Sequence, residues 1–139
     1  MNNPTSLSLQ EQRALADALD DEYKSYETYQ QVIRDFGPVR PFINIVEAEA
    51  RHIAALLALF TTYAVAPPAN RWAVQAPRFA DVHAACVAGV QGEIDNVALY
   101  DRLLHATHRP DVLQVFHALR SASQDRHLPA FQRCAQRAA

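Results

Sequence analysis

Apolar residues in this chain recur at intervals of three and four positions, the spacing of one face of an α-helix. A strand buried on one face would instead alternate at every second position. In the first segment of the chain the series is Leu15, Leu19, Tyr26, Tyr29, Ile33 and Phe36. Comparable series run through three later segments. The pattern predicts an all-α protein with four amphipathic helices.

Capping residues, glycines and prolines set the expected ends of these helices. Ser8 and Glu11 have the spacing of a capping box, and Gly37 followed by Pro38 can end a helix, so the first helix is expected at residues 9–36. The other three are expected at residues 41–63, 78–104 and 111–137.

Prolines also mark the irregular parts of the chain. A connector rich in proline is expected at residues 64–77, where Trp72 should pack over the helices. Inside the fourth helix, Pro129 predicts a kink because it lacks the backbone N–H that a helix uses.

Length and composition predict a single domain spanning residues 1–139. Half of the residues are apolar, and 13 Lys and Arg stand against 15 Asp and Glu, which excludes a disordered chain. Lys24 is the only lysine, and the arginines are scattered, so no nucleic-acid partner is expected. The apolar run at residues 53–60 is too short to span a membrane, and residues 2–8 lack the pattern of a signal peptide.

Each predicted helix carries polar residues in the middle of its apolar face. These residues are Glu22, Glu49 with His52, Glu93, and Gln124 with His127. Burying such carboxylates and imidazoles without compensation costs several kcal/mol each. Arg120 is the only obvious counter-charge on these faces, so a pair of metal cations could supply the missing positive charge.

The spacing within two of the helices suits metal binding. Glu49 and His52 are three residues apart, which places both on one helix face, and Gln124 and His127 repeat that spacing. Carboxylate and imidazole ligands with open positions suit iron or manganese. Two such ions could share the two-electron reduction of oxygen or peroxide.

The order of these groups resembles the ferritin-like superfamily, whose di-iron bundles take one Glu from each of two helices and Glu-x-x-His from the other two. The resemblance covers about residues 9–134. The stretches that carry it look like a bacterial subfamily of uncharacterised ferritin-like domains; they are residues 14–29, 36–42, 44–57 and 127–131. It implies an antiparallel four-helix bundle with a long connector between the second and third helices.

The resemblance also implies a role for each residue. Glu22 and His52 would bind one iron, Glu93 and His127 the other, and Glu49 would bridge the two. The second bridging ligand is expected at position 124. Because Gln124 is a neutral and weaker ligand, the second metal position is expected to be weaker or empty.

Two tyrosines lie near these ligands in the sequence. Tyr26 is one turn from Glu22, and Tyr100 is two turns from Glu93. Both are candidates for hydrogen bonds to the ligands or for redox roles, and plain core packing is the alternative.

The functional expectation is a metal-binding protein, with two Fe ions and with Mn or Zn as alternatives, that acts on ferrous iron, oxygen or peroxide. A non-enzymatic module with one structural metal is the competing hypothesis, favoured by Gln124. A third hypothesis is a metal-free polar network. A homo-oligomer is compatible with all three.

The two cysteines bear on the compartment. Cys86 lies seven residues before Glu93 and Cys134 seven after His127, so in antiparallel neighbouring helices both would lie toward the same end. A disulfide would indicate a periplasmic or secreted protein whose leader has been removed, and two free thiols a cytoplasmic one. With His83 the two cysteines could instead form a separate metal site.

Overall fold

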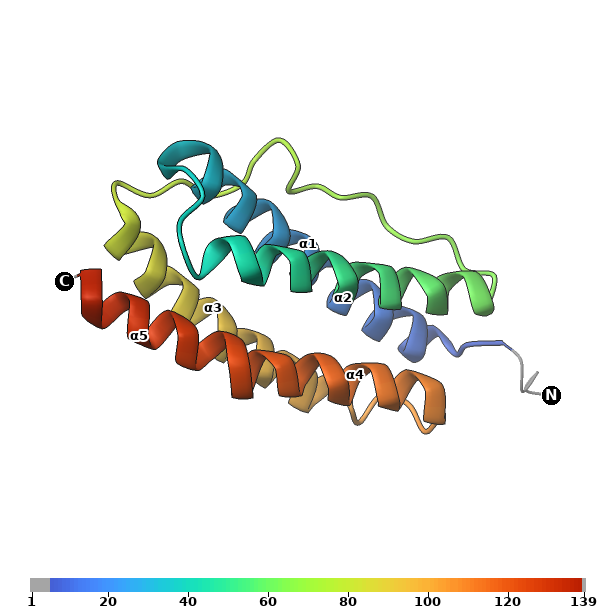
Figure 1. Ribbon diagram of the computed structural model, residues 1–139. Helices are drawn as coiled ribbons and strands as arrows, with labels where there is room; N and C mark the ends of the chain where they lie inside the picture. Colours follow the sequence, from blue (N-terminus) through green and yellow to red (C-terminus); the bar gives the residue numbers. More distant parts are fainter. Residues whose placement is uncertain (1–5, 139) are drawn as a thin grey trace.

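The computed structural model describes residues 6–138, and all their regular structure is helical. The elements are α1 (Leu9–Phe36), α2 (Phe42–Thr62), α3 (Val82–Leu103), α4 (Pro110–Ala122), the π-helical turn η1 (Ser123–His127) and α5 (Leu128–Ala138), shown in Figure 1. No strand occurs within residues 6–138, and α4, η1 and α5 follow one another without a break. The prediction of an all-α protein with four helical segments is confirmed. Of residues 2–8, whose sequence lacks the pattern of a signal peptide, residues 2–5 lie outside the described residues.

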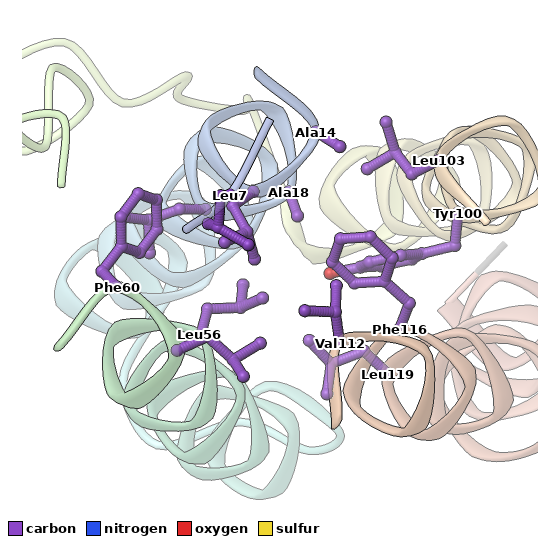
Figure 2. Packing of buried hydrophobic residues seen from close by; sticks show 13 residues of the cluster. Leu7, Ala14, Ala18, Leu56, Phe60, Tyr100, Leu103, Val112, Phe116 and Leu119 are labelled. Carbon is purple, nitrogen blue, oxygen red and sulfur yellow. The ribbon is translucent and has the colours of Figure 1, made fainter. Parts of the chain in front are cut away.

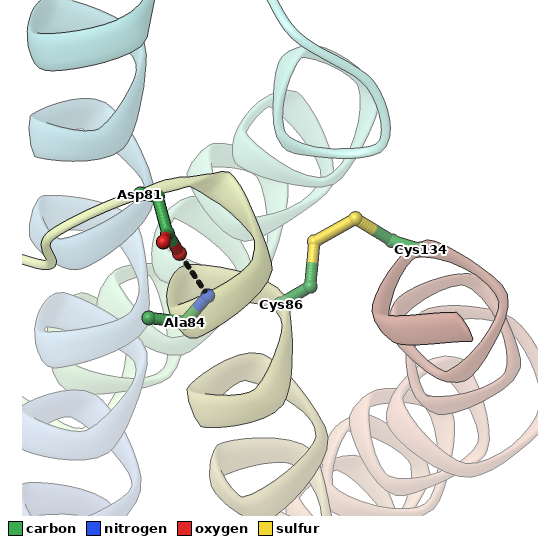
Figure 3. The surroundings of a disulfide bond; sticks show 4 residues. All are labelled: Asp81, Ala84, Cys86 and Cys134. Carbon is green, nitrogen blue, oxygen red and sulfur yellow. Dashed lines mark hydrogen bonds between the residues drawn. A yellow bond between two sulfur atoms is a disulfide. The ribbon is translucent and has the colours of Figure 1, made fainter. Parts of the chain in front are cut away.

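Local hydrogen bonds explain where the helices begin. Ser8 Oγ accepts from the Glu11 N–H at 3.1 Å, and Glu11 Oε1 accepts from the Ser8 N–H at 2.9 Å, so α1 begins with the expected capping box. The third helix begins four residues later than predicted, because the Asp81 carboxylate caps it by accepting from the Ala84 N–H at 2.8 Å (Figure 3).

The helices pack in two pairs. α1 packs against α2, and α3 packs against α5. Figure 1 shows that the two helices of each pair run in opposite directions, and that α2 and α3 begin at the same end of the molecule. Residues 63–81, which we call the connector, return along the outside of the helices from the end of α2 to the start of α3.

The connector is attached to α1 through polar contacts. Arg71 donates two hydrogen bonds to Asp20, at 2.8 and 2.9 Å, and the Trp72 indole donates to the same carboxylate at 3.2 Å. Trp72 is half-buried, with the Lys24 ammonium 5.2 Å from its ring centre. The indole therefore covers part of α1, as the sequence predicted.

Two apolar clusters fill the space between the helices. One includes Leu19, Leu56 and Phe116 and is shown in Figure 2. The other includes Phe42 and Phe131, whose ring centres are 5.3 Å apart. On every helical segment the polar residues of the predicted site lie, in sequence, between members of the two clusters. The predicted ligands thus occupy a layer between two apolar halves of the core.

The last helical segment contains the irregularity that Pro129 predicted, but in a different form. Helical geometry widens into the π turn η1 immediately before Leu128 and Pro129. Proline cannot donate to the carbonyl four residues earlier and its ring crowds that carbonyl, and a π turn relieves both conflicts. The widened turn shifts the faces of the residues that it contains.

No helix within the described residues is long and apolar enough to cross a bilayer. Cys86 of α3 and Cys134 of α5 are joined by a disulfide, with their Cα atoms 5.9 Å apart (Figure 3). The bond links the two helices that also pack together. Both thiols are therefore consumed, so they cannot form a metal site with His83.

Candidate metal centre

Three glutamates and two histidines meet in the layer between the apolar clusters. Glu22, Glu49 and His52 form half-site A, and Glu49, Glu93 and His127 form half-site B. Within each half-site one ligand atom from every residue lies within 4.8 Å of the others. All three glutamates are only 1% exposed. Glu49 belongs to both half-sites.

The two oxygens of Glu49 face different histidines. Its Oε1 is 3.1 Å from His127 Nδ1, and its Oε2 is 3.6 Å from His52 Nδ1. His127 Nδ1 is also 3.0 Å from Glu93 Oε1, whereas His52 Nδ1 is 3.7 Å from Glu22 Oε1. Half-site B is thus closed by hydrogen bonds, and half-site A is more open.

Half-site A contains two buried polar atoms without a hydrogen bond. Within the described part of the chain, neither Glu49 Oε2 nor His52 Nδ1 has a hydrogen-bond partner. Buried polar atoms are nearly always satisfied, so such a facing pair needs an explanation. A cation between these atoms would satisfy both.

Two buried tyrosines hold the outer glutamates in place. Tyr100 of α3 donates to Glu22 Oε1 at 2.8 Å, and Tyr29 of α1 donates to Glu93 Oε2 at 2.6 Å. Each tyrosine lies seven residues after the glutamate on its own helix and binds the glutamate of the other helix. For Tyr100 a hydrogen bond to a ligand was one of two alternatives, beside core packing, whereas the sequence predicted Tyr29 only as a core residue.

The other predicted tyrosine lies away from the cluster. Tyr26 is half-buried, and its hydroxyl accepts a hydrogen bond from Gln30 at 3.0 Å. The hydroxyl of α1 that reaches the glutamate of α3 belongs to Tyr29. Tyr29 lies two turns after Glu22, whereas Tyr26 lies only one turn after it.

Gln124, predicted as a ligand on the inner face, points outward. It is exposed, and its Oε1 accepts from the Arg120 guanidinium at 2.6 Å. In a π turn the hydrogen-bonded ring contains one more residue than in an α-helix, so residues three apart no longer share a face. Ser123, four residues before His127, is buried instead. Arg120, the expected counter-charge, binds Asp101 at 2.5 Å.

Ser123 belongs to a buried hydrogen-bonded chain that the sequence did not reveal. Its hydroxyl donates to Asn96 Oδ1 at 2.6 Å, and Asn96 Nδ2 donates to Asp21 Oδ2 at 2.7 Å. These hydrogen bonds join η1, α3 and α1. Burial raises the pKa of Asp21 to about 6. Asn96, three residues after Glu93, was the signal that could have indicated this network.

The electrostatics of the cluster reflect its three carboxylates. Burial, reinforced by the charge of Glu49, raises the pKa of Glu22 to about 8. Burial alone would lower the pKa of each histidine, but the facing carboxylates raise it to about 10 for His52 and about 9 for His127. Without metal, protons on the imidazoles therefore supply the positive charge that the carboxylates require.

No family model and no curated protein sequence matches this chain. A crystal structure of a hypothetical protein from Methanococcus jannaschii DSM 2661 is similar, with a TM-score of 0.85. The match covers 99% of this chain and 85% of that protein at 19% sequence identity. It shows a common fold.

Proposed function

We propose that this chain is a ferritin-like four-helix protein whose central cluster binds two metal ions, one in each half-site. Iron is the expected metal, with manganese or zinc as alternatives. The observation that supports this proposal most directly is that the two oxygens of Glu49 face Nδ1 of His52 and of His127, at 3.6 and 3.1 Å. A carboxylate with that placement can bridge two ions.

The arrangement of the helices supports the ferritin-like part of the proposal. Such bundles join two antiparallel helix pairs by a crossover between the second and third helices. Here the connector runs from the end of α2 to the start of α3 along the outside of the helices (Figure 1). The four ligand-bearing segments then supply Glu, Glu-x-x-His, Glu and His in that order.

The donors present fit a pair of hard or borderline cations. Three carboxylates and two imidazole nitrogens face a common interior, and three glutamates buried together favour bound positive charge. The unpartnered Glu49 Oε2 and His52 Nδ1 add to the fit. Because Gln124 points outward, Glu49 is the one residue within 6–138 that belongs to both half-sites.

The activity that we propose is oxidation of ferrous iron by oxygen or peroxide. In this reaction ferrous iron is the substrate: two ferrous ions would each give up one electron, and the two electrons would reduce oxygen to peroxide or peroxide to water. The chain's own residues orient the site: Tyr29 binds Glu93 Oε2, which leaves Oε1 directed toward the interior, and Tyr100 fixes Glu22. Apolar clusters lie on both sides of this layer.

The Cys86–Cys134 disulfide favours an oxidising compartment such as the periplasm or the cell exterior. We include this location in the proposal.

A structural site with a single metal is the second candidate. It is favoured by the outward position of Gln124 and by the hydrogen bonds that close half-site B. In that case only half-site A would be filled, and the ion would stabilise the fold without turnover.

Anaerobic loading with Fe(II) tests the proposal. After removal of unbound iron, we expect about two ions per chain and a change in the optical spectrum when air is admitted. Glu49→Ala should reduce the content to one ion or none, whereas Glu47→Ala, an exposed carboxylate on the same helix, should leave it unchanged. One ion in the unaltered chain, with no reaction in air, would support the second candidate, and none would contradict both.

A further inference from the structure

A cleft of about 630 Å³ opens between α2 and the segment formed by α4, η1 and α5. It reaches the proposed metal centre from outside, since both His52 and His127 line it. Their rings are 5.6 Å apart and nearly parallel, at 19°. The histidines thus form one surface of the cleft.

The chain places an arginine immediately before each of these histidines. Arg51 precedes His52 and Arg126 precedes His127, and both arginines are exposed and line the cleft. Within residues 6–138, neither guanidinium has an ion pair or a hydrogen bond to another residue. Arg120, by contrast, binds Asp101 at 2.5 Å. Two uncommitted guanidinium groups therefore flank the cleft.

The histidines add hydrogen-bond donors to this surface. Their Nδ1 atoms face the glutamates, so the opposite ring edge, with Nε2, is directed away from the carboxylates. When a metal ion occupies Nδ1, the proton of neutral imidazole lies on Nε2. Nε2 is then an N–H donor that adds to the two guanidinium groups.

The remaining walls are small and largely apolar. They include Ile45, Ala48, Ala118, Leu119, Ala122 and Ala130. Asp125 is the one carboxylate among the lining residues, so it offsets only one of the two guanidinium charges. Such a cleft combines an anion-binding surface with room for a hydrocarbon group.

We propose that this cleft binds a small organic carboxylate. Its carboxylate would accept hydrogen bonds from Arg51, Arg126 and the histidine Nε2–H groups, and its hydrocarbon part would lie against the alanines. The inference goes beyond the proposed function because it requires no bound metal. It places an organic anion directly beside the imidazoles of the proposed metal centre.

Calorimetric titration of the metal-free chain with hexanoate, acetate and inorganic phosphate tests the proposal. We expect hexanoate to bind more tightly than the other two. Arg51→Gln and Arg126→Gln should each weaken hexanoate binding about ten-fold, the loss expected for one charge-assisted contact. Arg13→Gln, which removes the same charge from an exposed position on α1, should have no effect.

A second variant tests the apolar walls. Ala122→Leu should fill the cleft and weaken hexanoate binding more than acetate binding, and circular dichroism checks that the variant folds. Nitrogen NMR of the histidine rings should show hexanoate perturbing Nε2 of both His52 and His127.

Three results would overturn the proposal: no binding of hexanoate, equal affinity for phosphate, or an equal loss in Arg13→Gln. A chain that binds hexanoate but no metal would retain this inference and lose the proposed function. A chain that binds metal but not hexanoate would retain the proposed function and lose this inference.

Discussion

Half-sites A and B have the same composition but different backbones. Glu49 and His52 lie in the regular helix α2, where a separation of three residues places both on the inner face. Gln124 and His127 have the same separation within the π turn η1, and there only His127 faces inward. Ligand spacing read from a sequence therefore holds only where the helix is regular.

The half-sites also differ in how well their donors are satisfied without metal. The His127 side chain is 5% exposed and its Nδ1 lies within hydrogen-bonding distance of two carboxylates, at 3.0 and 3.1 Å. The His52 side chain is 12% exposed and its Nδ1 is unpartnered. A metal ion entering half-site A displaces fewer contacts, so we expect this half-site to fill first.

The largest expected contrast comes from removing one histidine at a time. His52→Ala should abolish the tighter metal-binding step, because it removes a ligand of the more open half-site. His127→Ala should leave that step and abolish the weaker one. Stepwise anaerobic titration with Fe(II), followed by metal analysis, measures both. Loss of the tighter step in His127→Ala alone would reverse our ranking of the half-sites.

Acid should weaken binding in both half-sites. The pKa values of about 10 for His52 and about 9 for His127 mean that both Nδ1 atoms carry protons near neutral pH, and a metal ion must displace them. Apparent affinity should therefore fall as the pH is lowered, by about ten-fold per pH unit for each proton displaced. Zinc titration against a chelating dye at several pH values measures this slope. A flat profile would exclude these histidines as ligands.

The hydrogen bonds from Tyr29 and Tyr100 should contribute similarly to the stability of the metal-free protein. Tyr29→Phe and Tyr100→Phe each leave a buried carboxylate oxygen without its donor, which should lower the free energy of unfolding of the metal-free protein by about 1–3 kcal/mol. Urea denaturation measures the change. Tyr26→Phe, which removes a hydroxyl that accepts a hydrogen bond from Gln30, is the control and should have a smaller effect. An equal loss of unfolding free energy in all three variants would show that the hydroxyls of Tyr29 and Tyr100 contribute no more than that of Tyr26.

The smallest effect is expected at Gln124, the predicted ligand that lies at the surface. Gln124→Glu should leave metal content unchanged, because the side chain lies at the surface beside Arg120. Unfolding free energy should change by less than about 0.5 kcal/mol, as at other surface positions. Gln114→Glu, also exposed on the same helical segment, is the control. A gain of metal in Gln124→Glu alone would show that η1 can turn this residue inward.

Much of this architecture follows from local sequence signals. The capping box at Ser8 and Glu11 fixed the start of α1, and apolar periodicity identified all four helical segments. Five of the six predicted ligands come together in the structure, because each lies on a seam that the apolar neighbours bury. These signals act within one helix, so they can be read without knowing its neighbours.

Contacts between helices were harder to predict. The pairing of Tyr29 with Glu93 depends on the relative displacement of α1 and α3, which no single helix encodes. Pro129 indicated an irregularity, but not that it would be a π turn that turns Gln124 outward and buries Ser123. Those outcomes depend on how the last segment packs against α3.

The most direct test of the shared role of Glu49 is a crystal structure of the iron-loaded protein with anomalous scattering recorded at the iron edge. We predict two anomalous peaks, one beside His52 and one beside His127, each in contact with a different oxygen of Glu49. A single peak, or two peaks of which neither contacts Glu49, would contradict the claim that this carboxylate joins two metal sites.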